Sequence, residues 1–194
     1  MRRLLTAGVA VAAVLAGCAS PAPVPPAPVA DGPAVTVELP PRPRDVPVDG
    51  IDPCTLLTEA DRAELGLDFE PRLTTSPSTL YNGGIIQLCS IRSSRPGVGS
   101  VGVALSVTGG IELFLRPGVP ATITPIQLAG FPAVVADPTR FTEFCNVVVD
   151  VAPQQVVDID VANAGNIPAI PEAELCREAE QIASIVMGNL LVRR

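Results

Sequence analysis

The first residues with evident chemistry are Leu15-Ala16-Gly17-Cys18, which follow Arg2, Arg3 and an apolar run at residues 4–15. A basic start, an apolar run of roughly 7 to 15 residues and small residues before a processing point are typical of a secretory signal. The leucine three positions before the cysteine marks the variety in which the cysteine sulfur receives a diacylglycerol. We therefore predict a signal peptide at 1–17 and lipidation of Cys18, in preference to an ordinary secretory signal with an incidental cysteine.

The predicted lipid anchor indicates where in the cell the protein is located. A spanning helix needs about 20 apolar residues, and the run at 4–15 is too short for that. Two acyl chains, palmitate among them, would hold the chain stably, because each buried CH₂ contributes about 0.8 kcal/mol. We expect a lipoprotein on the extracytoplasmic face of the cell membrane, with the membrane as partner through Cys18.

Four further cysteines form the second chemical set: Cys54, Cys89, Cys145 and Cys176. An even number in an exported chain indicates disulfides, and the three ways of pairing four cysteines remain open. A four-thiolate metal site is the alternative, but the sequence has no C-x-x-C spacing. We prefer Cys54 with Cys89 and Cys145 with Cys176, because each pair joins neighbouring segments and links a helix to the sheet.

Three aspartates form a candidate metal site: Asp150, Asp158 and Asp160. Pairing Val151 with Val157 in a hairpin places the large apolar residues on one face and sets Asp150 opposite Asp158. Like charges opposite one another cost roughly 0.2 to 1 kcal/mol, which a cation such as Ca²⁺ would relieve. A solvated outer face that tolerates the repulsion is the preferred interpretation, so we expect no metal and no other cofactor.

Composition removes several classes of function. The chain contains no His and no Lys, which excludes Ser-His-Asp catalysis and Schiff-base chemistry within this chain. Without Arg2 and Arg3, the 13 basic residues fall to 11, against 20 acidic ones. This acidity argues against nucleic acid as a partner. An enzyme would have to use carboxylates such as Asp150 and Asp158, so we expect a noncatalytic protein.

The elements that would position these residues belong to one α+β domain at 51–194, which follows a disordered Pro-rich tether at 18–50. Hydrophobic alternation predicts strands, about five of which form an antiparallel sheet. The candidate segments are 85–91, 101–107, 122–128, 133–136, 144–151 and 156–161. Capping signals predict a short N-terminal helix at 58–65, and helical spacing predicts a long C-terminal helix at 171–192.

The segment 101–107 has one face of large apolar residues and one of small residues. The small face contains Gly102, Ala104 and Ser106, which could floor an apolar cavity. Close packing of a helix against these small side chains is the preferred prediction. Tyr81 lies in a polar stretch, and we expect it to be exposed in a loop.

Several short motifs occur in a characteristic order: Asp-Pro-Cys-Thr-Leu-Leu-Thr at 52–58, Cys89, Gly-Phe-Pro-Ala at 130–133, Cys-Asn-Val at 145–147 and Cys176. On these motifs the chain resembles domain-of-unknown-function family 3558, actinobacterial lipoproteins with a lipobox and a Pro-rich tether. Members often have Trp two residues after the second cysteine, where this chain has Ile91. The resemblance implies a small α+β envelope domain and no known reaction.

These observations lead to three functional hypotheses. The first is a noncatalytic lipoprotein that binds another envelope component or protein. The second is a carrier of a small apolar or lipid ligand held between sheet and helix, and the third is a carboxylate-based enzyme. A closed apolar cavity of about 300 Å³ or more would favour the carrier. An exposed apolar patch over a solid core would favour the binding domain.

Overall fold

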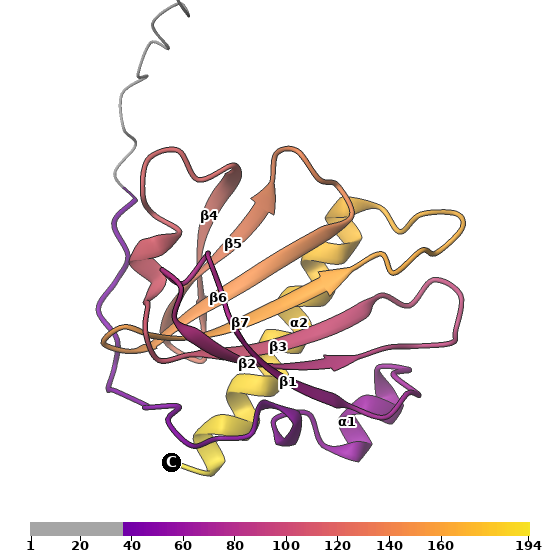
Figure 1. The fold of residues 1–194 in the computed structure, drawn as a ribbon, viewed down its shortest axis with the longest axis horizontal. Coiled ribbons are helices and arrows are strands. Elements are labelled where there is room, and N and C mark those ends of the chain that lie inside the picture. The colour runs from indigo at the N-terminus through magenta and orange to yellow at the C-terminus, as the bar shows by residue number, and fades with distance from the viewer. Residues whose placement is uncertain (1–36) are drawn as a thin grey trace, which may run out of the picture. The chain divides into compact units, whose positions relative to one another are not determined.

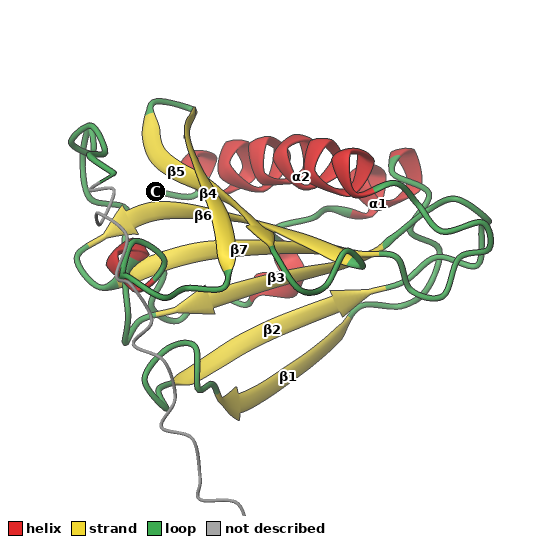
Figure 2. Cartoon of the chain, turned by 90° about the horizontal axis from the view of Figure 1, so that it is seen from above, coloured by secondary structure: helices red, strands yellow, loops and turns green. Residues whose placement is uncertain are grey.

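A seven-stranded antiparallel sheet, with a long helix along one face, organises the computed structural model (Figures 1 and 2). The structure describes residues 37–194, so Cys18 and the first half of the predicted tether lie outside the described residues. The strands are β1 (Arg72–Pro77), β2 (Ile85–Ile91), β3 (Ser100–Ser106), β4 (Ala121–Leu128), β5 (Phe131–Pro138), β6 (Phe144–Ala152) and β7 (Gln155–Ala162). Their order across the sheet is β1-β2-β3-β7-β6-β5-β4. The predicted α+β class is confirmed.

The prediction of about five strands is wrong, since the sheet has seven. β1 is the strand that the sequence pattern concealed. It is an edge strand that pairs only with β2, and all of its residues are exposed. Hydrophobic alternation marks a strand with one buried face, so a strand exposed on both faces gives no such signal.

Both helices lie within their predicted ranges, although only the first has a side-chain cap at its start. α1 (Glu59–Glu64) begins after Thr58, which accepts from the backbone N–H of Asp61 and donates its own backbone N–H to the Asp61 carboxylate. This reciprocal pair is a capping box. α2 (Glu172–Val192) buries one stripe of apolar side chains against β6 and β7. The stripe consists of Leu175, Ala179, Ile182, Ala183, Val186, Met187 and Leu190.

Two disulfides attach helical segments to the sheet. Cys54–Cys89 joins the 3₁₀ turn Pro53–Thr55 to β2, and Cys145–Cys176 joins β6 to α2. This is the pairing preferred from the sequence. Cys89 and Cys145 are both fully buried within the core on the helix side of the sheet.

The folded unit begins before residue 51, so the prediction of a disordered tether through residue 50 is wrong for its last part. Val46 and Val48 are 0% and 1% exposed and belong to the core on the helix side. The Val46 N–H donates to the Val151 carbonyl at 2.7 Å, and Arg42 forms an ion pair with Asp150 at 2.6 Å. The alternating valines of this Pro-rich segment bury enough apolar surface to order it.

The β6–β7 hairpin has a different register from the predicted one. Val149, not Val151, lies opposite Val157. The strands are joined by a tight turn at Pro153-Gln154, in which Gln154 has a φ of 59° as type II turns require. A bulge at Val151 accommodates this short turn. The predicted register has the correct face of each strand. It pairs each residue of β6 with a β7 residue two positions further along the chain than the structure does.

Removing the Cys145–Cys176 disulfide tests its contribution to stability. The two cysteines are separated by 31 residues in the sequence. Loops of this size contribute about 3 to 4 kcal/mol by the chain-entropy model. The Cys145→Ala, Cys176→Ala double variant should lose that much free energy of unfolding in urea titrations. Cys18→Ala, which leaves both disulfides intact, is the control, and an unfolding midpoint equal to that of the control would contradict the prediction.

Candidate functional site

The face of the sheet opposite α2 is only partly covered, and this partial cover creates the candidate site. Antiparallel pairing directs the even-numbered residues of β2, β3, β6 and β7 to this face. A second apolar cluster covers the β5–β6–β7 side of the face. It consists of Tyr81, Ile111, Leu113, Phe114, Val134, Ala136, Val148 and Val156. The β2–β3–β7 side has no such cover in the part of the chain that the structure describes.

A groove of about 390 Å³ lies on this uncovered side and is open to solvent. Its floor is β3, whose residues on this face are small: Gly102 and Ala104, with Ser100 at one end. The sequence allows these small residues to floor a cavity, but the preferred prediction is close packing of a helix against them. That preference is wrong, because α2 packs on the opposite face of the sheet (Figure 2).

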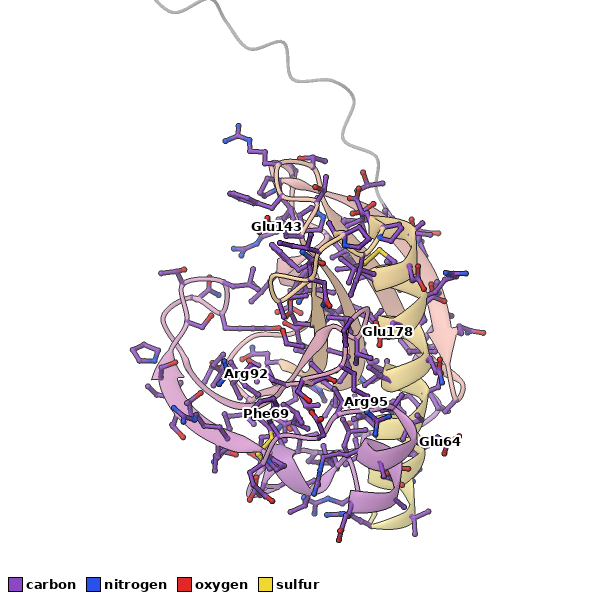
Figure 3. The ribbon with its side chains drawn as sticks, turned by 90° about the vertical axis from the view of Figure 1, so that its right-hand side faces the viewer. Glu64, Phe69, Arg92, Arg95, Glu143 and Glu178 are labelled. Carbon is purple, nitrogen blue, oxygen red and sulfur yellow. A yellow bond between two sulfur atoms is a disulfide. The ribbon has the colours of Figure 1, made fainter. Side chains whose placement is uncertain are left out.

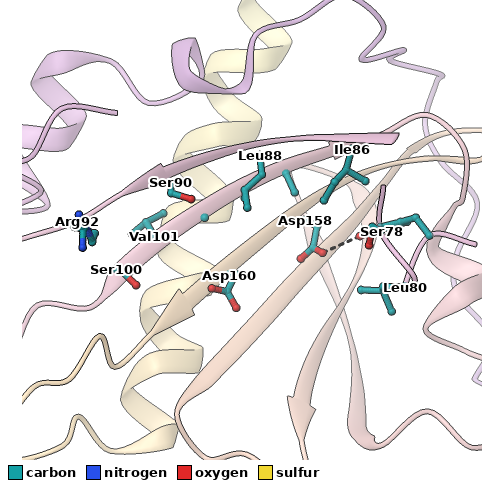
Figure 4. A pocket seen from close by; sticks show the side chains of 13 residues that line it. Ser78, Leu80, Ile86, Leu88, Ser90, Arg92, Ser100, Val101, Asp158 and Asp160 are labelled. Atoms are coloured by element: carbon teal, nitrogen blue, oxygen red, sulfur yellow. Dashed lines mark hydrogen bonds between the residues drawn. The ribbon is translucent and has the colours of Figure 1, made fainter. Parts of the chain in front are cut away.

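The two walls of the groove differ in chemistry, as Figure 4 shows. Ile86 and Leu88 of β2 form an apolar wall on one side. Asp158 and Asp160 of β7 form an acidic wall on the other. Pairing aligns the walls in rows, since Ala104 lies between Leu88 and Asp158 and Gly102 lies between Ser90 and Asp160.

Asp158 is held by two hydrogen bonds. The Tyr81 hydroxyl donates to one carboxylate oxygen at 2.7 Å, and the Asn146 amide donates to the other at 2.9 Å. Asp158 is only 6% exposed, and this burial raises the pKa of its carboxyl group, while the two hydrogen bonds oppose the rise. Its position and orientation are therefore fixed.

Tyr81 closes one end of the groove. It is 1% exposed and packs edge-to-face on Phe114, with ring centroids 6.1 Å apart. Burial and the nearby Asp158 raise the pKa of its hydroxyl well above the ordinary value. The prediction of an exposed Tyr81 is wrong, because the turn that carries it folds back over the sheet to reach a residue 77 positions away.

Asp160 has a different environment. No described side chain donates a hydrogen bond or forms an ion pair with its carboxylate, although three ion pairs occur elsewhere in residues 37–194. Burial, and then the charge of Asp158, raise its pKa to about 7. The acidic wall therefore contains one satisfied carboxylate and one without a partner in the described chain.

Arg92 lies at the end of the groove opposite Tyr81 (Figure 4). It is exposed, and its guanidinium stacks over the ring of Phe69, 5.6 Å from the centroid (Figure 3). Cation–π contacts of this kind hold a guanidinium without neutralising it. No ion pair joins Arg92 to the acidic wall.

The three aspartates proposed as metal ligands do not come together. Asp150 lies opposite Val156 rather than Asp158, and it pairs with Arg42. Burial raises the pKa of Asp150, and Arg42 counteracts this. Within residues 37–194, no group of three His, Cys, Asp or Glu side chains is arranged to hold a metal ion. The register explains the error, because the predicted pairing sets Asp150 opposite Asp158, whereas the observed pairing sets it opposite Val156.

The structure is that of an α+β domain, with a helix on one face of its sheet and an open, two-walled groove on the other. The chain belongs to the family described as Protein of unknown function (DUF3558), whose model matches residues 13–189. No curated protein and no solved structure gave a match. Among residues 37–194, neither helix combines the length and apolar character that a membrane crossing needs.

The raised pKa of Asp160 predicts a pH-dependent stability. The folded state keeps this proton up to about pH 7, whereas the unfolded chain releases it near 3.8. The stability from this protonation is fully present below about pH 4 and is lost as the pH rises through 7. The difference between the two pKa values corresponds to at most about 4 kcal/mol.

Asp160→Asn should therefore raise the free energy of unfolding at about pH 8.5 and change it little at about pH 4. Urea titrations at both pH values measure this. Glu64→Gln, which removes one exposed carboxylate of α1, is the charge-matched control. A lower stability of Asp160→Asn at the higher pH would show that an unidentified interaction stabilises the ionised carboxylate.

Proposed function

We propose that this protein is an extracytoplasmic lipoprotein, anchored in the cell membrane through Cys18, whose domain is a noncatalytic binding module of the cell envelope. The groove between β2 and β7 is the observation that carries the binding proposal. The Leu-Ala-Gly-Cys motif at 15–18 and the basic, apolar start support the anchor. The two disulfides are consistent with an oxidising compartment.

The chemistry of the groove favours binding over reaction. Asp158 already accepts two hydrogen bonds, which fix it as a structural acceptor. General acid and base catalysis requires a titratable group that is free to approach within hydrogen-bond reach of the transferred proton. Asp150, the partner that a carboxylate-based enzyme was expected to use, lies in an ion pair with Arg42 instead. An apolar wall facing an acidic wall is suited to orienting a ligand.

A carrier of a small apolar or lipid ligand is the second candidate, and the groove volume favours it. The groove measures about 390 Å³, and small-molecule pockets measure about 300 to 1,000 Å³. The expected location between sheet and helix is wrong, since that space is filled by core residues such as Ile159 and Ile182, both 0% exposed. The groove is also open along one side, so it would present a ligand rather than enclose it.

The anchor is tested by Cys18→Ser. The wild-type protein should fractionate with membranes and should have an intact mass larger than the processed polypeptide by a diacylglycerol and any further acyl chain. Cys18→Ser should appear in the soluble extracytoplasmic fraction, because it lacks the sulfur that accepts the lipid. Its four other cysteines should still form both disulfides, which a thiol assay verifies. An unmodified wild-type mass, or equal membrane retention of the variant, would refute the anchor.

The binding role is tested by filling the groove. A Cβ added at Gly102 would lie 3.2 Å from Leu88 Cδ1 and 3.4 Å from Asp160 Cβ. Gly102→Val should therefore occlude the groove while keeping a residue suited to a strand. Native mass spectrometry of protein isolated from its own envelope should show a bound small molecule in the wild type and a large loss in Gly102→Val. Equal occupancy in both, with unchanged folding, would place the binding elsewhere.

A further inference from the structure

We propose that the groove binds the primary ammonium group of a linear aliphatic amine, with the nitrogen beside Asp160 and the methylene chain lying over Gly102 and Ala104. This inference rests on the proposed binding function of the same groove and specifies the class of its ligand.

Charge complementarity is the first argument. The acidic wall contains two carboxylates on adjacent rows of the sheet, Asp158 and Asp160. Asp158 receives neutral donors from Tyr81 and Asn146, and Asp160 receives no donor from a described side chain. None of the ion pairs among residues 37–194 includes either carboxylate. A ligand cation would supply the missing charge, and a charged donor is favourable in a partly buried site.

The shape of the groove argues for an unbranched ligand. At Gly102 the space between Leu88 and Asp160 exists only because the glycine has no side chain, as the distances of 3.2 Å and 3.4 Å from an added Cβ show. Ala104 continues the floor toward the Tyr81 end, about 7 Å further along the strand. A chain of methylene groups can lie along this floor and contact the apolar wall. A primary ammonium can donate an N–H to Asp160, whereas a quaternary headgroup has no N–H to donate.

Other ligand classes match less well. Ca²⁺ takes six to eight oxygen ligands, and a single pair of carboxylates beside an apolar wall does not supply them. An anionic headgroup would be repelled by the acidic wall. Among the described residues that line the groove, Arg92 is the one basic side chain, and it lies at the far end, stacked on Phe69. A primary ammonium on an aliphatic chain satisfies both walls at once.

The inference also predicts how binding depends on pH. The titratable groups that line the groove are Asp158, Asp160, Tyr81 and Arg92. Asp160 ionises at about pH 7, while an aliphatic amine stays protonated well above that value. The affinity for an amine should therefore rise between about pH 5.5 and 8.5. A neutral ligand of the same length should not show this rise.

The experiment is a titration of the full exported chain carrying Cys18→Ser, purified without detergent, with n-octylamine. Backbone amide chemical shifts locate the ligand, and the parallel probes are n-octanol, n-octanoate and octyltrimethylammonium. We expect n-octylamine to shift the amides of residues 100–104 and 158–160. Asp160→Asn should weaken binding roughly tenfold to a hundredfold, because it removes a charged hydrogen bond. Gly102→Val should abolish binding, and Glu64→Gln should leave it unchanged.

Three results would overturn the inference. The first is no binding of n-octylamine to a folded protein. The second is equal binding of n-octanol or octyltrimethylammonium, and the third is an Asp160→Asn variant that binds as the wild type does. If a native ligand is nevertheless lost from Gly102→Val, the proposed binding function stands and only the ligand class is wrong. If no envelope molecule occupies the groove either, both fail.

Discussion

The antiparallel pairing of β3 with β7 is the constraint on which both the core and the groove depend. Val103 lies opposite Ile159, and both point into the core beneath α2. The next pair, Gly102 and Asp160, points to the opposite face and lines the groove. A register shift of one residue would move the side chains of β7 to the opposite faces of the sheet. The Asp160 carboxylate would then be buried under α2, which carries a large desolvation penalty. Burial of the apolar residues therefore fixes the register of β3 and β7. This register places the small residues of β3 and the two carboxylates of β7 along the groove.

The fold tolerates two neighbouring carboxylates on β7, Asp158 and Asp160, because other parts of the structure stabilise the domain. The side beneath α2 is a solid core reinforced by two disulfides, and the segment that contains Val46 and Val48 adds to it. The bulge at Val151 contributes to this segment directly, since its carbonyl accepts the Val46 N–H. Proteins commonly place local conflicts at functional sites and compensate for them elsewhere. Asp160, half-buried and without a partner in the described chain, is such a conflict.

Much of the fold could be predicted from the sequence wherever one face of an element is buried. Alternation predicts the six other strands, a capping box predicts α1 and helical spacing predicts α2. The core-facing positions of the strand cysteines favour the observed disulfides. β1 gave no signal because it is exposed on both faces. The burial of Tyr81 depends on a contact with Asp158 that is distant in sequence, and the hairpin register depends on a bulge that local periodicity does not encode. The sequence allows the small residues of β3 either to floor a cavity or to pack against a helix, and the preferred helix packing is wrong because tertiary packing decides which face α2 covers.

If the groove between the apolar wall of β2 and the acidic wall of β7 is the ligand site, a crystal structure of the protein grown with n-octylamine should show the amine there. We expect an ammonium nitrogen within hydrogen-bond distance of the Asp160 carboxylate, with the alkyl chain over Ala104 and against Leu88. A groove that stays empty at saturating amine, or an amine bound only on another surface, would contradict it.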